Sequence, residues 1–199
     1  MTIVEPSAAL EYDFDGAEVM KHLEACGRTC YKSEGNDADK FVRMLIRRGH
    51  ESVLEHFSAT FRIVCDRGVM AELTRHRLCS FSVESTRYVN YSKRGLKFIK
   101  PLSTRRITDI VFEEIADHAE RAYRELLSEG VKPEEARSIL PLSLATELTM
   151  TANLREWRHL LKLRTSSKAH PQMRQIAGMI LSALKAKLPV VFEDICYDA

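Results

Sequence analysis

The sequence predicts an α+β fold in which a small mixed sheet is covered by helices. Stretches with apolar residues three or four positions apart, which is helical spacing, lie between stretches where apolar and polar residues alternate as in strands. The chain has 199 residues, 45% hydrophobic and 29% charged, which suits one globular domain. Because no repeat, low-complexity segment or long linker divides it, we expect a single domain over residues 1–199.

Helical spacing appears first near the N-terminus. Residues 15–30 place Val19, Leu23 and Cys26 on one face, and residues 39–48 repeat the pattern up to Gly49, a residue that favours a helix end. Pro133 fits the first turn of another helix. The remaining helices are expected at residues 69–77, 108–128, 154–163 and 171–188.

Alternating residues predict the strands. Residues 58–66 alternate around Phe61, Ile63 and Cys65, and we expect a turn at Arg67 and Gly68 directly after them. Residues 143–152 alternate in the same way. Residues 86–91 and 97–99 are rich in β-forming side chains and are also expected to be extended.

Charge and composition exclude several classes of protein. The chain carries 30 basic and 28 acidic side chains, a balance that does not predict nucleic-acid binding. No apolar run is long enough for a membrane span, and residues 1–10 lack a signal-peptide pattern, so we expect a cytoplasmic protein. Five cysteines in a chain of this size favour reduced thiols over a disulfide framework.

The segment 75–88, RHRLCSFSVESTRY, carries the strongest chemical signal, with three Arg, one His, three Ser and one Thr. One explanation is the last turn of a helix, where the dipole favours cations by about 0.3–1 kcal/mol. The other is a phosphate site, because a hydroxyl-rich loop followed by Arg87 on a strand would converge donors on one anion. Composition alone leaves both explanations open.

The spacing within this segment resembles the signature of the flavin-dependent thymidylate synthases, in which Arg-His-Arg is followed after seven residues by Ser. Four further blocks resemble the family in order and spacing, namely residues 49–56, 136–141, 153–155 and 163–164. The resemblance covers most of the chain, from the first helix to Phe192. Five blocks in sequence order are far more specific than a short Arg-His-Arg.

The resemblance implies the reductive methylation of deoxyuridine monophosphate (dUMP) to thymidine monophosphate. FAD reduced by NADPH would supply the hydride, and methylenetetrahydrofolate the carbon. The family also implies a homotetramer whose active sites form where subunits meet. We therefore expect dUMP, methylenetetrahydrofolate and NADPH as partners, and neither a membrane nor a nucleic acid.

The resemblance also assigns individual residues. Positions that match FAD contacts are Ser52, Arg75, His76, Arg77, Val83, Asn153, Leu154, Arg155 and His159. Positions that match nucleotide contacts are Glu72, Leu73, Thr74, Arg75, Val83, Glu84, Ser85, Thr86, Arg87, Arg137 and Arg164. Arg164 is the expected catalytic residue, since a fixed guanidinium that stabilises an anion on the uracil ring lowers the barrier to attack by carbon 5.

Two positions within the signature stand out. The family usually carries Glu or Gln where this chain has Val83, which removes a hydrogen-bonding side chain where flavin and nucleotide would meet. Cys79 is interpreted as a small buried hydrophobe because the family needs no cysteine nucleophile, the alternative being a reactive thiol activated by nearby Arg side chains.

Other residues favour a structural role. His50 and His56 are six residues apart, whereas a zinc-binding HExxH helix needs four, so no metal is expected, and the resemblance places His50 beside flavin or folate. Cys26 and Cys30 are interpreted as core positions, although the spacing also suits a redox pair. Trp157 is expected in the core.

Two further alternatives stay open. The basic run Lys93, Arg94, Lys97, Lys100, Arg105 and Arg106 could bind nucleic acid or the extra phosphate of NADPH, although a solvated loop is favoured. A nucleotide-binding or nucleic-acid-binding module that has lost turnover is the alternative to the flavin enzyme. The colour of bound flavin would separate the two functions.

Overall fold

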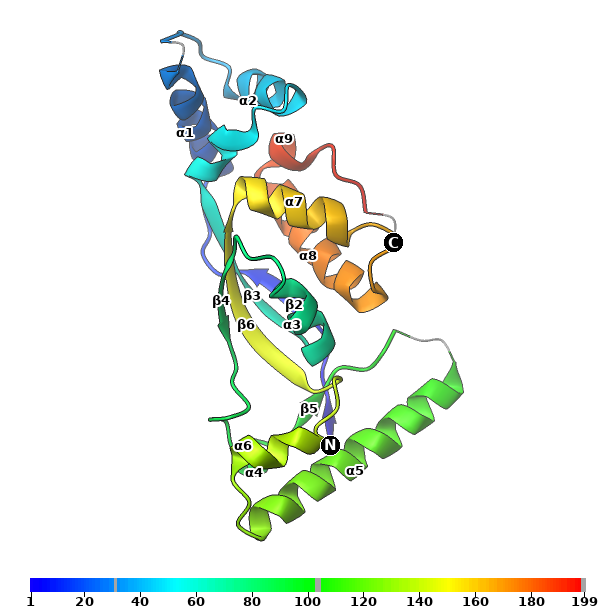
Figure 1. Ribbon diagram of the computed structural model, residues 1–199. Coiled ribbons are helices and arrows are strands. Elements are labelled where there is room, and N and C mark those ends of the chain that lie inside the picture. The colour runs from blue at the N-terminus through cyan, green and yellow to red at the C-terminus, as the bar shows by residue number, and fades with distance from the viewer. Residues whose placement is uncertain (31, 103–104, 198–199) are drawn as a thin grey trace. The chain divides into compact units, whose positions relative to one another are not determined.

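The computed structural model describes residues 1–30, 32–102 and 105–197, and it confirms a mixture of helices and small sheets (Figure 1). The described strands form two sheets where the sequence predicts one. Strand β1 (Thr2–Ile3) pairs in parallel with β5 (Lys97–Phe98). The other sheet has the order β2 (Ser7–Leu10), β3 (Ser58–Asp66), β6 (Ala145–Asn153), β4 (Ser80–Val83).

Most helices lie where the periodicity predicts them. These are α1 (Gly16–Thr29), α2 (Ala38–Arg47), α5 (Arg106–Ser128), α6 (Pro133–Ala136), α7 (Leu154–Arg164) and α8 (Pro171–Lys187). Gly49 and Gly130 follow α2 and α5 with φ of 73° and 83°, the left-handed region that glycine enters without strain. The sequence did not predict α4 (Tyr91–Arg94), α9 (Pro189–Phe192) and the 3₁₀ helices η1 (Glu51–His56) and η2 (Arg137–Ile139). No described helix combines the length and apolar character that a membrane crossing requires.

Helix α3 (Arg67–Leu73) corrects two predictions. The expected turn at Arg67 and Gly68 is instead the start of the helix, because the Asp66 carboxylate accepts a hydrogen bond from the Val69 amide at 2.7 Å and caps it. The helix ends at Leu73 rather than at residue 77. Residues 75–77 therefore lie beyond the helix, and the helix-dipole explanation for their charges is wrong.

The prediction of extended structure at residues 86–91 is also wrong. The Ser85 carbonyl accepts hydrogen bonds from the amides of Tyr88 and Val89, which closes a turn. The Asn90 side chain then accepts from the Ser92 amide at 2.9 Å and caps α4. Local turn chemistry outweighs the β propensity of this segment.

Contacts between residues divide the chain into two compact units. The first unit contains residues 1–7, 63–75 and 82–148, and the second contains residues 8–62, 76–81 and the C-terminal part from residue 149. Strands β3 and β6 contribute residues to both units. The single domain over residues 1–199 stays a prediction.

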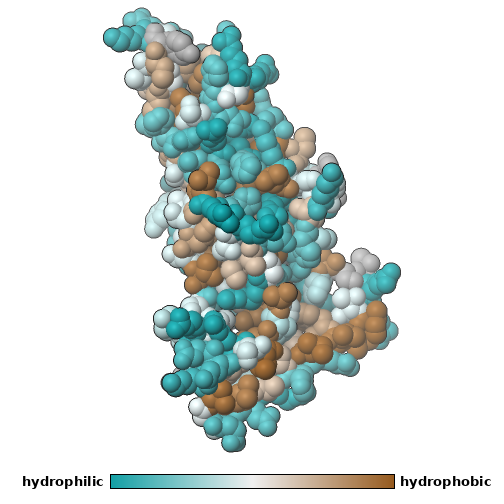
Figure 2. All heavy atoms as spheres, in the orientation of Figure 1, coloured by the Kyte–Doolittle hydropathy of each residue, from teal (hydrophilic) through white to brown (hydrophobic). Residues whose placement is uncertain are grey.

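The first unit packs around α5. Phe98, Tyr123 and Leu144 are at most 1% exposed and form a core together with Tyr91 and Ala136. The opposite side of α5 faces solvent with large apolar side chains, which Figure 2 shows as brown spheres along this helix. We call this the apolar face of α5; it consists of Ile107, Ile110, Val111 and Ile115, which are 43–63% exposed.

The second unit packs around α7, which lies beside α8 (Figure 1). Trp157, the only tryptophan of the chain, is completely buried, as predicted. Its indole nitrogen donates to the Ala59 carbonyl at 3.0 Å, and its ring meets the edge of Phe61 at 5.2 Å. These contacts join α7 to strand β3.

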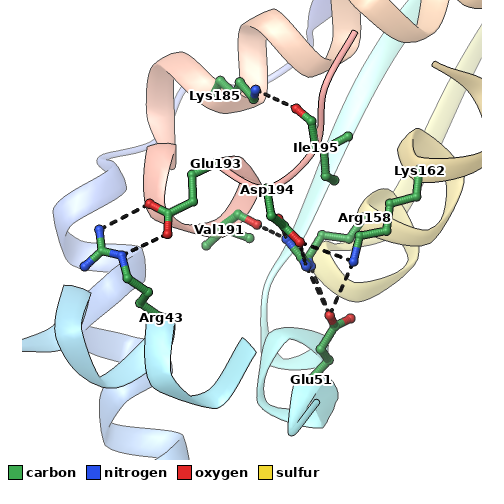
Figure 3. Close-up of polar contacts among 9 residues, drawn as sticks. All are labelled: Arg43, Glu51, Arg158, Lys162, Lys185, Val191, Glu193, Asp194 and Ile195. Carbon is green, nitrogen blue, oxygen red and sulfur yellow. Dashed lines mark hydrogen bonds and ion pairs between the residues drawn. The ribbon is translucent and has the colours of Figure 1, made fainter. Parts of the chain in front are cut away.

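A buried cation holds the C-terminal segment to α7 (Figure 3). Arg158 is 1% exposed and donates to both carboxylate oxygens of Asp194, at 2.7 and 2.8 Å. It also donates to Glu51 at 3.1 Å and to the Val191 carbonyl. Because Arg158 donates to it, the pKa of Asp194 falls to about 2. We call Glu51, Arg158, Lys162 and Asp194 the Arg158 cluster.

Candidate functional site

The predicted site residues fall into two groups, one in each unit. The first unit holds Glu72, Leu73, Thr74, Arg75, Val83, Glu84, Ser85, Thr86, Arg87 and Arg137. The second unit holds Ser52, His76, Arg77, Asn153, Leu154, Arg155, His159 and Arg164. Most predicted nucleotide contacts therefore share the first unit and most predicted flavin contacts the second.

In the first unit, Glu84 directly after β4 is held from several sides. Its backbone amide donates to the Glu147 carbonyl at 2.9 Å, and its carboxylate accepts from the Tyr91 hydroxyl at 3.2 Å. Arg67 donates to the Glu84 carbonyl at 3.2 Å. Burial and then the charge of Glu84 raise the pKa of Tyr91, so the phenol stays protonated and donates. These bonds fix the start of the hydroxyl-rich loop.

Two exposed guanidinium groups lie at this loop, Arg87 within it and Arg137 at the start of η2. Arg137 donates to the Thr86 hydroxyl at 3.1 Å, and the Ser85 hydroxyl accepts from the Arg87 amide at 3.3 Å. The Arg87 guanidinium is 3.8 Å from the carboxylate of Glu134, and both side chains are about half exposed. Paired cations beside hydroxyl groups at one turn suit an anionic ligand such as phosphate.

Three predicted positions in the cores or on β4 offer little side-chain chemistry. Leu73 and Leu154 are completely buried, so only their backbone can face a ligand. Val83 is half-buried at the end of β4 and has no polar side-chain atom. Within α3 and the turn after it, Thr74 and Arg75 are exposed and Glu72 is half-buried.

In the second unit, His76 lies between two charged residues of α7. The Arg164 Nε donates to the His76 Nε2 at 3.1 Å. On the other side of the ring, the Glu156 Oε1 lies 3.6 Å from Nδ1. His76 and Glu156 are both 7% exposed, so water screens their charges little. The structure thus brings together the predicted residues His76 and Arg164.

Glu156 was missed by sequence reasoning. It lies four and eight residues before Leu160 and Arg164, so all three share one side of α7. The sequence shows this spacing, but nothing in the sequence indicates that the acidic side chain is buried against His76.

His76, Glu156 and His159 also place three possible metal-ligand atoms within 4.8 Å of one another. Two imidazoles and a carboxylate are a donor set that zinc accepts. However, the Arg164 guanidinium already donates to His76 Nε2, and a cation at that position opposes a second one. We therefore interpret the group as part of a polar cluster in which Arg164 donates to His76 and the charge of Glu156 lies beside the other ring nitrogen. In the part of the chain that the structure describes, neither His50 nor His56 belongs to such a group.

The start of α7 positions Asn153 and Arg155, two further predicted flavin contacts. The Asn153 side chain accepts from the Glu156 amide at 2.9 Å and caps the helix, which directs Arg155 outward. Arg155 is 52% exposed and pairs with Glu55 at 2.6 Å. Ser52, Arg77 and His159 are also exposed. The second unit therefore presents exposed cations, Arg77 and Arg155, and a hydroxyl.

The cysteines follow the predictions in part. All five thiols are free. Burial, then the charge of Glu156, raises the pKa of Cys79 to about 12, which favours an inert thiol over a reactive one. Cys26 is half-buried but Cys30 is exposed, so the interpretation of both as core positions is wrong for Cys30. It is the C-cap of α1, one residue beyond the last residue of the helix.

The basic run after residue 92 is partly neutralised. Lys100 lies 3.0 Å from Asp109 and 3.9 Å from Glu113, both on α5. Lys97, Arg105 and Arg106 are exposed. The side chains of Lys93 and Arg94 lie outside the part that the structure describes. The acidic partners of Lys100 favour a solvated surface over a nucleic-acid site.

Comparison with known proteins gives a consistent result. The family model described as "Thymidylate synthase complementing protein" matches residues 15–190. The probable flavin-dependent thymidylate synthase of Mycobacterium phage L5 is 35% identical over 202 residues, covering 92% of this chain and 82% of that protein. The flavin-dependent thymidylate synthase of Geobacter sulfurreducens is 34% identical over 180 residues, covering 84% and 78%.

A solved structure agrees. The UMP/dUMP methylase PolB from Streptomyces cacaoi, bound with 5-Br dUMP, superposes with a TM-score of 0.80. It is 25% identical, and the match covers 97% of this chain and 96% of that one.

Proposed function

Because the chain belongs to the flavin-dependent thymidylate synthase family, we propose that it methylates dUMP at carbon 5 with the help of bound FAD. The match of the family model over residues 15–190 carries this conclusion. The finer parts of the proposal are the carbon donor methylenetetrahydrofolate, the reductant NADPH and a homotetramer.

The donors of the second unit fit FAD. Exposed Arg77 and Arg155 suit the pyrophosphate, since guanidinium groups bind phosphate oxygens in pairs, and the Ser52 hydroxyl adds a neutral donor. The chemistry that bound, reduced FAD would supply is the hydride needed to complete the methyl group. The protein side chains orient the cofactor and the nucleotide, and they stabilise charge on the uracil ring.

The donors of the first unit fit the nucleotide phosphate. Arg87 and Arg137 are exposed; Arg87 lies in the turn after Ser85, and the Arg137 guanidinium donates to Thr86 of the same turn. Hydrogen bonds from a guanidinium to phosphate are roughly twice as strong as neutral ones, so these two residues should dominate the affinity for dUMP. Arg164 is assigned to the uracil ring, where a cation stabilises the anion that makes carbon 5 nucleophilic.

The apolar face of α5 supports the oligomer. Four large aliphatic side chains on one side of a 23-residue helix are 43–63% exposed. Contact with a second copy of the chain would remove this face from water. Light scattering should give about four times the 22.8 kDa chain mass, and Ile110→Glu together with Ile115→Glu should lower it. A wild-type protein that stays monomeric with FAD would contradict the tetramer.

Flavin binding is the first test of the function. The purified protein should be yellow, or should become so on addition of FAD. Arg77→Ala should weaken FAD by about tenfold or more, because one charge-assisted contact is lost, whereas the surface change Arg121→Ala should not. Equal affinity of the Arg77 variant and the wild type would show that this block does not hold the cofactor.

The second test separates an enzyme from a module that only binds. Release of tritium from dUMP labelled at carbon 5, with methylenetetrahydrofolate and NADPH present, should require Arg164. Arg164→Ala should lower the rate by about two orders of magnitude or more while FAD stays bound. Nucleotide binding without any tritium release by the wild type would favour the binding module.

A further inference from the structure

The side chains around His76 constrain the position of its ring proton. An arginine Nε is always a donor in proteins, because the guanidinium does not deprotonate. The His76 Nε2 that receives it at 3.1 Å must therefore be an unprotonated acceptor. A neutral imidazole in this place carries its proton on Nδ1.

Glu156 lies on the side of the ring that carries this proton. Its Oε1 is 3.6 Å from Nδ1, a distance at which the carboxylate acts through its charge rather than through a formed hydrogen bond. Both side chains are 7% exposed, which preserves the attraction. A negative charge beside Nδ1 favours the tautomer that has its proton there.

Neither His159 nor Cys79 supplies the negative charge that favours the Nδ1-protonated tautomer of His76. The His159 ring centre lies 6.2 Å from that of His76, and His159 is exposed to water. Cys79 contacts His76 through its backbone amide, which donates to the His76 carbonyl, and its thiol stays neutral. Of these neighbours, Glu156 is the one that bears a negative charge.

We propose that Glu156 is a positioning residue, which holds His76 in the Nδ1-protonated tautomer so that Nε2 accepts from Arg164 and orients the guanidinium. The inference rests on the proposed role of Arg164 and adds Glu156 to the residues on which catalysis depends. With the wrong tautomer, Nε2 would carry a hydrogen that points at the Arg164 donor. The guanidinium would then turn away from its place, although Arg164 itself is still present.

The tautomer can be measured directly. Nitrogen-15 NMR of the FAD-bound protein, labelled in its seven histidines and assigned with His76→Asn, should show an unprotonated Nε2 on His76. In Glu156→Ala this resonance should move toward the protonated position. A wild-type His76 with its proton on Nε2 would overturn the proposal.

Turnover tests the consequence for Arg164. Glu156→Ala should lower kcat about tenfold or more and change KM for dUMP about twofold or less, because the guanidinium matters most in the transition state. Glu156→Gln keeps the length of the side chain but removes the charge beside Nδ1, so its kcat should stay close to that of Glu156→Ala. Neither variant removes the Asn153 cap, because the cap uses the backbone amide of residue 156.

The control is Glu193→Ala, which removes an exposed carboxylate from the same unit and should leave both tautomer and kcat unchanged. Loss of stability with an unchanged tautomer and unchanged kcat in Glu156→Ala would show a merely structural role and overturn the proposal. Absence of turnover in the wild type would instead refute the proposed function, while the NMR result would still decide the tautomer.

Discussion

Replacing Arg158 by Met should destabilise the second unit strongly. Met has a similar length and no charge, so the change removes the hydrogen bonds to Asp194, Glu51 and the Val191 carbonyl with little loss of volume. Figure 3 shows that these bonds connect α7, η1 and the C-terminal segment through one guanidinium. The measured quantity is the free energy of unfolding.

The size of the effect follows from the exposure of the partners. Removal of one partner from a fully buried ion pair costs about 3–5 kcal/mol. Arg158 is 1% exposed, but the Glu51 and Asp194 side chains are 22% and 43% exposed, so water can solvate the abandoned carboxylates in part. We therefore expect a loss of about 2–4 kcal/mol, to which the buried Val191 carbonyl contributes.

Arg43→Met is a matched control in the same region. Arg43 pairs with Glu193, the neighbour of Asp194, at 2.9 Å, and the two side chains are 33% and 43% exposed. Exposed pairs contribute about 0.2–1 kcal/mol, so this variant should lose no more than about 1 kcal/mol. Both variants replace Arg by Met, but Arg158 is buried and donates to three partners, whereas Arg43 is half-buried and pairs with Glu193.

Urea unfolding followed by circular dichroism measures both losses. In a double-mutant cycle, Arg158→Met and Asp194→Asn should cost less together than the sum of the single changes, because both break the same bonds. The reasoning is refuted if Arg158→Met costs no more than Arg43→Met, or if the cycle is additive.

Three further predictions concern single residues. The pKa of Asp194 is lowered from 3.8 to about 2, so its stabilising effect is present above about pH 4 and disappears as the pH falls through 2. After a discount for its exposure, the free energy of unfolding of the wild type should fall by about 1 kcal/mol relative to Asp194→Asn over that range in acid unfolding experiments. Parallel curves for the two proteins would contradict this. Val83→Gln restores a hydrogen-bonding side chain at the end of β4 and should raise the affinity for dUMP about three- to tenfold, as calorimetry would measure. Equal or weaker binding by the variant would show that the pocket is already arranged around valine. Cys79 has a pKa of about 12 and should resist iodoacetamide at about pH 8 in the native protein, while exposed Cys30 reacts, as mass spectrometry would show. Equal labelling of the two would be inconsistent with a neutral, half-buried thiol at Cys79.

Long periodic elements of this fold were predictable from the sequence. The strand at residues 58–66 has the predicted limits, and α5 differs by two residues at its start, because the spacing of apolar residues runs through each element without interruption. The end of α3 was not predictable in this way. Residues 74–77 are compatible with a helix, and nothing in their composition indicates the stop at Leu73.

The sequence motifs predicted which residues belong to the candidate site, but not how those residues are buried or paired. The blocks around Arg75, Asn153 and Arg164 identify the family, but spacing does not tell which side chains are buried. Glu156 shows the difference, since an acidic residue in the first turn of a helix normally faces water and stabilises the dipole. Its burial against His76 depends on a segment eighty residues earlier in the chain.

Trp157 gives the second unit a built-in optical probe. It is the only indole in the chain and is completely shielded from water, so its emission in the native state should be blue-shifted and should move to the red when α7 leaves strand β3. The same helix carries Arg155, His159 and Arg164, so a flavin bound there would quench this emission by energy transfer. Unfolding of α7 and cofactor occupancy can thus be followed in one unlabelled sample, at one excitation wavelength.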